Sequence, residues 1–350
     1  MQSKKVILFI SPNKSQFIQN DLLYLKQHYK IITNQYQWSK PLFTPLYLIH
    51  QCIVLLLKIW TIDKIIIHFG GYWSLLPTIF GKFFKKAVII ICHGTDCSSI
   101  PSLNYGSLRK KGVKFCCRFS YKYATIICPV SQSLYESNNQ YHNINVEQKQ
   151  GLITFFPKLK TPIKVIPNGL DYHFWITNTD IKKNKNSFLA VFSEKQFFLK
   201  GGDLIYEMAN NFPNYSFEIA GTNAPQHLSK YPKNLKFLGR LSQIELRDKY
   251  YQSEFYFQLS HFEGFGLSLC EAMLCQCIPI GSSVNMIPEI ISEHGFILEQ
   301  KNSNHLKKII EQAVALSDKK SFSKKAQKSI IDRFSIQQRN DRLLKVIQTN

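Results

Sequence analysis

The sequence predicts an α/β protein made of two doubly wound domains, each with a parallel β-sheet between layers of helices. Its 350 residues are enough for roughly two domains of about 100–200 residues each. Several short apolar segments rich in β-branched residues show no alternation with polar residues, which is typical of strands buried on both faces of a parallel sheet. Segments with helical periodicity separate these strands, as the crossover connections of such a sheet require.

The first half begins with a strand at 5–11, because the apolar run after Lys4 and Lys5 is too short for a signal peptide. The longest apolar stretch, 45–60, is interrupted by Gln51 and Lys58 and falls short of the about 20 residues that a membrane span needs. We therefore expect a buried helix there and no transmembrane helix. The other elements expected in this half are strands at 64–70, 87–94 and 125–131, and helices at 17–29 and near 74–85.

The alternation restarts after a turn cluster, Pro167-Asn168-Gly169, which marks the boundary between the domains. We expect an N-terminal domain over residues 1–168 and a C-terminal domain over 169–334. A basic helix at 335–350 is expected to pack back on the first domain. The strands expected in the C-terminal domain are 187–193, 215–221, 235–240, 254–260 and 277–282, with a helix at 202–212.

Positive charge is concentrated in the first domain. The net charge is +21; residues 1–168 hold 21 Lys and Arg against 5 Asp and Glu, and the remaining residues hold 23 against 18. A basic face attracts anionic partners such as nucleic acid, phospholipid headgroups or a phosphorylated acceptor, although a general enrichment in lysine gives the same total. The nine cysteines lie mostly in apolar runs, which favours buried thiols in a reducing cytoplasm and no metal site.

The segment 260–281, SHFEGFGLSLCEAMLCQCIPIG, places Glu263 and Glu271 around two glycines. We expect a strand to end before Glu263 and a helix to start near Gly266. Ligands of parallel sheets bind at the carboxyl ends of strands, where helix N-termini favour phosphate and glycines let an anion approach the backbone. Carboxylates accept hydrogen bonds from hydroxyl pairs, so a nucleotide-sugar fits. Two glutamates at this spacing also occur often by chance, as an ordinary helix residue and a loop acid.

The whole segment resembles the signature of the GT-B glycosyltransferases of family 4 (glycosyl transferases group 1). SHFEGFGLSLCEAM (260–273) matches every fixed position of S-x-x-E-G-F-G-L-x-x-x-E-A-M, and IPEII (287–291) follows at the expected distance. The resemblance covers most of 60–345 and implies two Rossmann-like domains that face each other across a cleft. Further family-like segments occur in the expected order at 128–134, 165–171, 199–205 and 237–260.

The resemblance also implies roles for individual residues. Glu271 would hold the ribose hydroxyls of the donor, Glu263 would lie beside the transferred sugar, and Lys200 would neutralise charge on the leaving diphosphate. No obligatory metal or other cofactor is implied, because a lysine or arginine takes the metal's place in such folds. The implied catalytic residues are Glu263, Lys200 and His93, and the donor-binding residues are Glu271, Gly264, Phe265, Gly266, Leu267, Lys195, Asn168 and Gly169.

The chain departs from the family pattern at three places. The family commonly has an arginine shortly before the lysine, where this chain has Lys195 ahead of Lys200; a lysine does not reproduce the bidentate guanidinium fork. The glycine-rich first loop is absent, since PNKSQF follows the first strand. Asn285-Met286 stands where the family usually has two glycines before I-P-E.

In the first domain, ICHGTDCS (91–98) ends an apolar strand with His93, and Asp96 follows shortly after. The resemblance places both residues beside the transferred sugar, with Asp96 and Tyr105 on the acceptor side. The alternative is a histidine at the edge of the core with a capping aspartate.

Together these features predict a glycosyltransferase of the hexosyltransferase type, and the resemblance implies that it retains the anomeric configuration. It moves a sugar from a nucleotide-sugar to a saccharide or lipid-linked acceptor in bacterial surface polysaccharide biosynthesis (lipopolysaccharide, O-antigen or capsule). The basic first domain suits a lipid-diphosphate acceptor, so we expect a cytoplasmic protein with peripheral contact to the anionic inner membrane face.

Three other functions compete with this prediction. A non-catalytic nucleotide-sugar binder fits the missing arginine, and a nucleic-acid-binding protein fits the net charge of +21. Nucleic acid is nevertheless not expected as a partner, because it leaves Glu263 and Glu271 unexplained. A dinucleotide-dependent oxidoreductase is excluded, since neither FISPNKS nor VFSEKQF provides the G-x-G-x-x-G that such an enzyme needs after its first strand.

Overall fold

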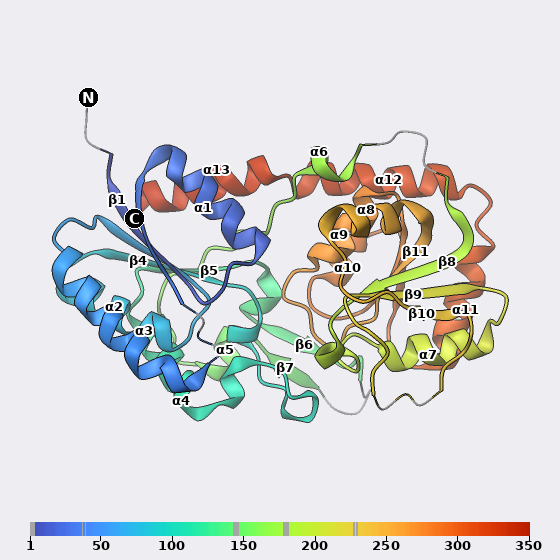
Figure 1. Ribbon diagram of the computed structural model, residues 1–350, viewed down its shortest axis with the longest axis horizontal. Helices are drawn as coiled ribbons and strands as arrows, with labels where there is room; N and C mark the ends of the chain where they lie inside the picture. Colours follow the sequence, from blue (N-terminus) through green and yellow to red (C-terminus); the bar gives the residue numbers. More distant parts are fainter. Residues whose placement is uncertain are drawn as a thin grey trace. The chain divides into compact units, whose positions relative to one another are not determined.

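The structure is a computed structural model in which the chain folds into two compact units (Figure 1). Unit 1 consists of Met1–Ser137, Lys149–Gly169 and Gln337–Asn350, and unit 2 consists of Asn138–Gln148 and Leu170–Ile336. The residues that the structure describes are 4–36, 38, 40–142, 147–177, 182–226, 228 and 230–350.

The sheet of unit 1 is 5-stranded and parallel, in the order β2-β1-β3-β4-β5. Its centre is β-branched: the isoleucines at 65–67 and 89–91 are fully buried. Successive side chains of a strand point to opposite faces, so helices have to cover both faces of this sheet. The strands are β1 (Val6–Ser11), β2 (Lys30–Gln35), β3 (Lys64–His68), β4 (Ala87–Cys92) and β5 (Ile126–Pro129).

Figure 1 shows α1 and α13 on one face of this sheet and α2, α3 and α4 on the other. The last helix, α13, packs within unit 1, where Leu343, Val346 and Ile347 are buried. The first and last helices of the chain therefore share one layer. The helices of unit 1 are α1 (Gln16–His28), α2 (Thr44–Lys58), α3 (Tyr72–Phe83), α4 (Lys111–Tyr123), α5 (Leu152–Phe155) and α13 (Ile336–Thr349).

The longest apolar stretch forms α2, but the prediction that this helix is buried is wrong. By length and composition Thr44–Thr61 is apolar enough to cross a membrane, and only 17% of it is buried. Its inward side carries Gln51, which donates hydrogen bonds to Asn34 Oδ1 and to the Trp73 carbonyl oxygen, at 3.2 and 3.1 Å. The polar residue that interrupts the apolar stretch therefore points inward, and most of the apolar residues point outward.

The main sheet of unit 2 is 6-stranded and parallel, in the order β10-β9-β8-β11-β12-β13. Counted along this unit, the order is the 3-2-1-4-5-6 of a Rossmann sheet. Its core is aromatic, since the Phe188 ring stacks on those of Phe217, Phe255 and Phe257 at 5.1, 4.7 and 5.0 Å. The strands are β8 (Asn184–Val191), β9 (Ser216–Ala220), β10 (Leu235–Phe237), β11 (Ser253–Gln258), β12 (Ile278–Ser282) and β13 (Phe296–Leu298).

Helices cover both faces of this sheet too, with α7 and α11 on one side and α8, α9 and α12 on the other (Figure 1). The predicted fold class, α/β with two doubly wound domains, is confirmed. That the domains face each other across a cleft stays a prediction. The helices of unit 2 are α6 (Tyr172–Trp175), α7 (Gly202–Asn211), α8 (Gln243–Gln252), α9 (Leu267–Leu274), α10 (Ile287–Ile291), α11 (Ser303–Val314) and α12 (Lys319–Arg333).

Two features were not expected from the sequence. β2 is largely polar, as KIITNQ, because it is an edge strand that pairs only with β1. The segment Asn138–Gln148 leaves unit 1 and joins unit 2, next to two short strands that pair with each other, β6 (Ser137–Asn139) and β7 (Gln148–Gln150). Tyr141 anchors this segment: its side chain is buried, and its carbonyl oxygen accepts the Lys301 N–H at 2.7 Å.

Candidate active site

The carboxyl ends of β8 and β11 mark the place in unit 2 where the strand order reverses. β8 pairs with β9 on one side and with β11 on the other, so the chain leaves these two strands in opposite directions along the sheet. In open α/β sheets, ligands bind in the crevice outside such a switch point. Lys200 follows β8 and Glu263 follows β11, which puts both of these sequence-derived candidates at the switch point.

Lys200 and Glu263 form an ion pair in which Nζ and Oε2 are 2.5 Å apart, and their side chains are only 14% and 15% exposed. The carboxylate has two further donors, since Gln258 Nε2 donates to Oε2 at 2.7 Å and the Gly264 N–H donates to Oε1 at 3.2 Å. Tyr256 OH in turn donates to Gln258 Oε1 at 3.2 Å. The switch point thus presents one cation and one oriented carboxylate, groups that can bind phosphate and hydroxyl oxygens of a single ligand.

The loops after β8 and β11 are joined through their backbones. The His261 N–H donates to the Leu199 carbonyl oxygen at 2.8 Å. Gly201 adopts φ 73, and a Cβ there would lie 2.6 Å from the Leu259 carbonyl oxygen. Only glycine combines this conformation with this close approach, so the glycine that follows the lysine of the ion pair holds the two loops together.

The glycine-containing segment after Glu263 turns the chain into α9. Gly266 caps this helix with φ 110, a conformation that residues with side chains rarely adopt. Phe265 is buried, with its ring edge-on to the Phe334 ring at 5.3 Å. Leu267 begins the helix, so the first N–H groups of α9, which favour phosphate, follow the ion pair closely along the chain.

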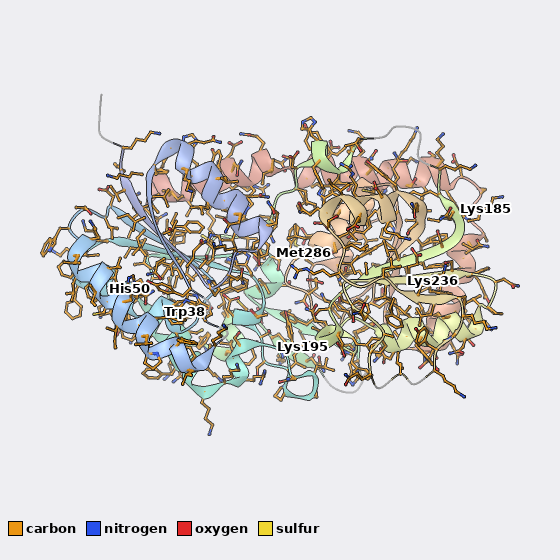
Figure 2. The ribbon with its side chains drawn as sticks, in the orientation of Figure 1. Trp38, His50, Lys185, Lys195, Lys236 and Met286 are labelled. Atoms are coloured by element: carbon orange, nitrogen blue, oxygen red, sulfur yellow. The ribbon has the colours of Figure 1, made fainter. Side chains whose placement is uncertain are left out.

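Asn285, where the family usually has a glycine, supports Glu263 directly. Its backbone adopts φ 50, which asparagine tolerates better than most residues that carry a side chain. Its Oδ1 accepts the Glu263 N–H at 3.0 Å. This departure from the family pattern therefore keeps the left-handed turn and adds a side-chain contact, next to the buried Met286 that Figure 2 labels.

Glu271 lies further along α9, and Tyr250 OH donates to its Oε2 at 3.3 Å. Burial raises the pKa of Glu271 to about 7. Burial and then the charges of Glu271 and Glu263 raise the pKa of Tyr256 well above its usual value. Both carboxylates therefore lie close to one buried tyrosine of β11, which brings the two acids singled out from the sequence into one region of unit 2.

Lys200, Glu263, Glu271 and the residues that hydrogen-bond to them lie within residues 174–329, which match the family model described as Glycosyl transferases group 1. This match supports a resemblance to the group 1 glycosyltransferases over somewhat less than half of the chain. The resemblance noted in the sequence is confirmed at this level, while the assignment to family 4 within the group stays a prediction.

Solved glycosyltransferase structures share the GT-B fold of the whole chain. A sucrose-phosphate synthase from Thermosynechococcus elongatus has a TM-score of 0.77 at 13% identity, with 99% of each chain covered. Anabaena HepE in complex with UDP and glucose has a TM-score of 0.71 at 15% identity, with 99% of this chain and 100% of HepE covered. At these identities the likeness concerns the fold alone.

Curated relatives match parts of the chain. A probable sucrose-phosphate synthase of Thermosipho melanesiensis is 25% identical over 258 residues, which are 67% of this chain and 57% of that protein. One human protein of the phosphatidylinositol N-acetylglucosaminyltransferase complex is 24% identical over 163 residues, 43% of this chain and 33% of that protein. The chain therefore spans little more than half of the first relative and a third of the second.

In unit 1, His93 follows β4 and its Nε2 lies 3.1 Å from His68 Nδ1. Burial lowers the pKa of His93 well below its usual value, so the ring is neutral at physiological pH. His68 is fully buried at the end of β3, and its Nε2 lies 3.8 Å from Asp21 Oδ2. Asp21 pairs with Arg339, whose Nε donates to Oδ1 at 2.7 Å. His93 is therefore the partly exposed end of a row of side chains that reaches α13.

The expectation that Asp96 contacts the acceptor is corrected to a structural role, because its side chain is fully buried. Oδ1 accepts the N–H groups of His93 and Gly94, both at 3.1 Å. Oδ2 accepts the Gly70 N–H at 2.9 Å and Tyr121 OH at 3.2 Å. This carboxylate holds the backbone that carries His93, which corresponds to the capping aspartate considered as the alternative.

The roles of the other site residues stay predictions. Lys195, labelled in Figure 2, is exposed in the short 3-10 helix Glu194–Gln196 and has no ion-pair partner in the described part of the chain. Tyr105 is half-buried and bridges to Ile100. Asn168 and Gly169 end the middle segment of unit 1. The buried Asn168 Oδ1 has no hydrogen-bond partner among the described residues.

Several residues that build the site were missed in the sequence. Gln258 is a polar residue between the apolar residues Phe257 and Leu259, and this break in the apolar run was the signal available in the sequence. His68 and His93 end neighbouring parallel strands of the same sheet, so their proximity could have been inferred. Tyr250 and Asp21 gave no local signal, because their partners lie 21 and 318 residues away.

Among the described residues, Cys92, Asp96 and Cys97 bring three possible metal ligands together. Burial raises the pKa of Cys92 to about 11 and that of Cys97 well above its usual value. Since Asp96 is already engaged and metal binding requires thiolates, this group fits a structural core better than a metal site. That the reaction needs no metal ion stays a prediction.

Glu271→Gln should change how the stability of unit 2 depends on pH. The pKa of Glu271 is about 7, against the usual 4.5, so the folded state keeps a proton that the unfolded state releases in this window. The free energy of unfolding therefore falls as the pH rises from 4.5 to 7, by up to about 3 kcal/mol at about 1.4 kcal/mol per pKa unit. The variant should lack this fall. Hydrogen exchange of the slowest amides of β11 and β12 measures the free energy of unfolding at pH 5 and pH 8. The same pH dependence in Glu271→Gln and in the wild type would contradict the prediction.

Proposed function

We propose that this chain transfers a sugar from a nucleotide-sugar to an acceptor hydroxyl, with retention of the anomeric configuration. The observation that carries the proposal is the Lys200–Glu263 ion pair at the switch point of a Rossmann sheet, inside the residues that match the group 1 family. One structural relative, Anabaena HepE, is known in complex with UDP-glucose. A ligand of that class has hydroxyls on both sides of a diphosphate, which suits the groups of unit 2.

Each group has one part in this reaction. Lys200 neutralises charge that develops on the leaving diphosphate, and the Gly264–Leu267 backbone faces the sugar and the diphosphate. Glu263, oriented by Gln258, accepts hydrogen bonds from hydroxyls of the transferred sugar. Glu271 accepts hydrogen bonds from the ribose hydroxyls, which requires its ionised form. Since Lys200 is paired with Glu263 in the free chain, the bound diphosphate replaces part of that pairing.

The acceptor itself supplies the nucleophile. Its hydroxyl oxygen bonds to the anomeric carbon while the bond from that carbon to the diphosphate oxygen breaks, and the hydroxyl proton passes to the departing diphosphate. Attack from the face that the diphosphate leaves retains the configuration. A covalent route through Glu263 is disfavoured, because Lys200 and Gln258 both occupy its Oε2.

We further propose that the acceptor is a saccharide or a lipid-linked intermediate of bacterial surface polysaccharide (lipopolysaccharide, O-antigen or capsule). The excess of positive charge in residues 1–168 favours a phosphorylated acceptor. The human relative is named for a phosphatidylinositol acceptor. Such an enzyme works in the cytoplasm, at the inner face of the membrane.

A panel of UDP-, GDP- and ADP-sugars tests the donor class by thermal shift. We expect one class to stabilise the chain, by about 2.7 kcal/mol at a concentration of 100 Kd. That donor, labelled and incubated with membrane extract, should then give a product with the donor's anomeric configuration. Glu271→Ala should weaken donor binding and transfer, whereas the exposed Lys236 of β10 provides Lys236→Ala as a control with neither effect.

The outcomes separate the alternatives. Binding of a donor without transfer to any acceptor would identify a non-catalytic sugar-nucleotide binder. The lysine in place of the family arginine supports this alternative, because a lysine does not reproduce the guanidinium fork. No binding of any nucleotide-sugar, or equal transfer by Glu271→Ala and wild type, would overturn the proposal. A product of inverted configuration would overturn retention alone.

A further inference from the structure

The outer side of α2 carries a continuous apolar stripe. Its members are 48–74% exposed, and their spacing of three or four positions places them on one side of a helix. This arrangement is the reverse of an ordinary surface helix, which turns its apolar side inward. The α2 stripe consists of Leu46, Ile49, Ile53, Leu56 and Leu57 on α2, and Trp60 in the turn that follows.

The stripe extends onto the neighbouring helices. Leu42 and Phe43, in the turn before α2, are also exposed, and so are Phe83 at the end of α3 and Phe115 on α4. The three helices lie side by side on one face of the sheet (Figure 1). Exposed apolar side chains gathered over neighbouring elements mark an interaction surface rather than scattered surface residues.

The same layer is strongly basic. Between Asp21 and Glu136 the only acidic residues are Asp63 and Asp96. Asp96 is buried, and Asp63 Oδ2 accepts the Val6 N–H at 2.6 Å. The exposed cations of this layer include Lys58, Lys82, Lys85, Lys110, Lys111 and Arg118.

We propose that the α2 stripe and the cations around it form a membrane-docking surface for an anionic lipid bilayer. The stripe inserts its side chains at the boundary between headgroups and acyl chains, and the cations contact lipid phosphates. Trp60, at the end of the stripe, and Lys58 beside it are residue types that favour this boundary. This inference does not depend on the proposed function.

The geometry favours a helix that lies on the membrane over one that crosses it. By length alone Thr44–Thr61 could cross a bilayer, so the connections of α2 decide between the two arrangements. α2 connects β2 to β3 within one sheet, so both of its ends are held on the same side. Docking of a second copy through this face would bring two basic surfaces together, which costs electrostatic energy.

Flotation of the full chain with vesicles tests the proposal. Vesicles of phosphatidylglycerol and phosphatidylcholine should bind the chain much more tightly than pure phosphatidylcholine, and added salt should weaken this binding. Ile49→Ser should weaken it about 10-fold, the order expected for one aliphatic side chain withdrawn from an apolar phase. Ile244→Ser on α8 is the matched control, because Ile49 and Ile244 are both 58% exposed, and it should leave binding unchanged.

Trp60 provides a second readout. Brominated lipids should quench its fluorescence, and Trp60→Phe should remove the quenched component. Ile49→Ser should leave the chain folded, because Ile49 is exposed, so its weaker binding reports on the docking surface itself. Equal binding to both vesicle types, or equal binding of the two serine variants, would overturn the proposal. Self-association of the chain that Ile49→Ser abolishes would also overturn the proposal. Failure of alkaline carbonate to extract the chain from membranes would overturn it as well.

Discussion

Lys200→Met should lower kcat/KM for sugar transfer about 10²–10³-fold, the loss expected when one preorganised charge at a developing anion is removed. Methionine keeps most of the length and volume of the lysine side chain, so the change tests charge rather than packing. The fall should appear mainly in kcat, because Lys200 already has a partner, Glu263, in the free chain. Charge on the diphosphate grows only as the glycosidic bond breaks. Steady-state kinetics with the donor found by thermal shift would measure both constants.

The variant has a structural side effect that a second variant controls. Without Lys200, the Glu263 carboxylate keeps Gln258 and Gly264 as donors but has no cation, and a half-buried unpaired charge is destabilising. Lys200→Met combined with Glu263→Gln should regain stability without regaining activity. Recovery of activity in this double variant would show that the lysine serves only to hold Glu263.

Two other lysines of unit 2 are informative comparisons. Lys195→Met should raise KM for the donor if this exposed residue replaces the family arginine. Lys236→Met should change neither constant, because Lys236 lies on the edge strand β10. Figure 2 labels both residues. Wild-type kinetics for the Lys200 variant would contradict the role assigned to the ion pair.

The sequence was most informative where the structure depends on neighbours in the chain. β3, β4 and β8 were expected within a few residues of their observed bounds, because a run of buried β-branched or aromatic residues has few alternatives to a central parallel strand. Glu263 and Glu271 were found because they share the short segment 260–273 with the glycines that start α9. Their signal did not require knowledge of any distant contact.

The rest depends on which side of an element faces inward and on contacts between distant residues. Both sides of α2 are largely apolar, so periodicity could not show that Gln51 faces the core. Asp96 was expected to contact a ligand because it follows β4. Its carboxylate instead accepts hydrogen bonds from three separate segments of the chain. The pairing of Asp21 with Arg339 joins residues 318 positions apart, and no spacing rule predicts such a contact.

Arg339→Met should destabilise unit 1 by about 3–5 kcal/mol, the cost of removing one partner of a buried ion pair. Arg339 and Asp21 are 2% and 0% exposed, and Nη2 lies 2.5 Å from Oδ2. Arg339 Nη1 also donates to the carbonyl oxygens of Ile166 and Pro167, at 3.2 and 3.0 Å. The variant leaves Asp21 charged and buried without a cation and removes this donor from both carbonyls. Exchange of the slowest amides of β1 and β3 reports this free energy for unit 1 by itself.

Arg342 on the same helix is the matched control, because it is exposed. Arg342→Met should change the stability by no more than about 0.5 kcal/mol. Adding Asp21→Asn to Arg339→Met removes the stranded charge and should restore part of the loss. Equal stability of the Arg339 and Arg342 variants would show that the pair contributes nothing to unit 1.

Arg339→Met should also raise the pKa of His68. Burial lowers this pKa to about 4, Asp21 raises it and Arg339 lowers it, so loss of Arg339 removes one lowering cause and leaves the Asp21 charge unopposed. NMR titration of the His68 ring would measure the change. His68 Nδ1 lies 3.1 Å from His93 Nε2, and a protonated His68 donates from both ring nitrogens, so His93 would have to accept through Nε2. The last helix of the chain would then set the tautomer of the catalytic candidate His93, and an unchanged His68 pKa would show that the ion pair does not influence it.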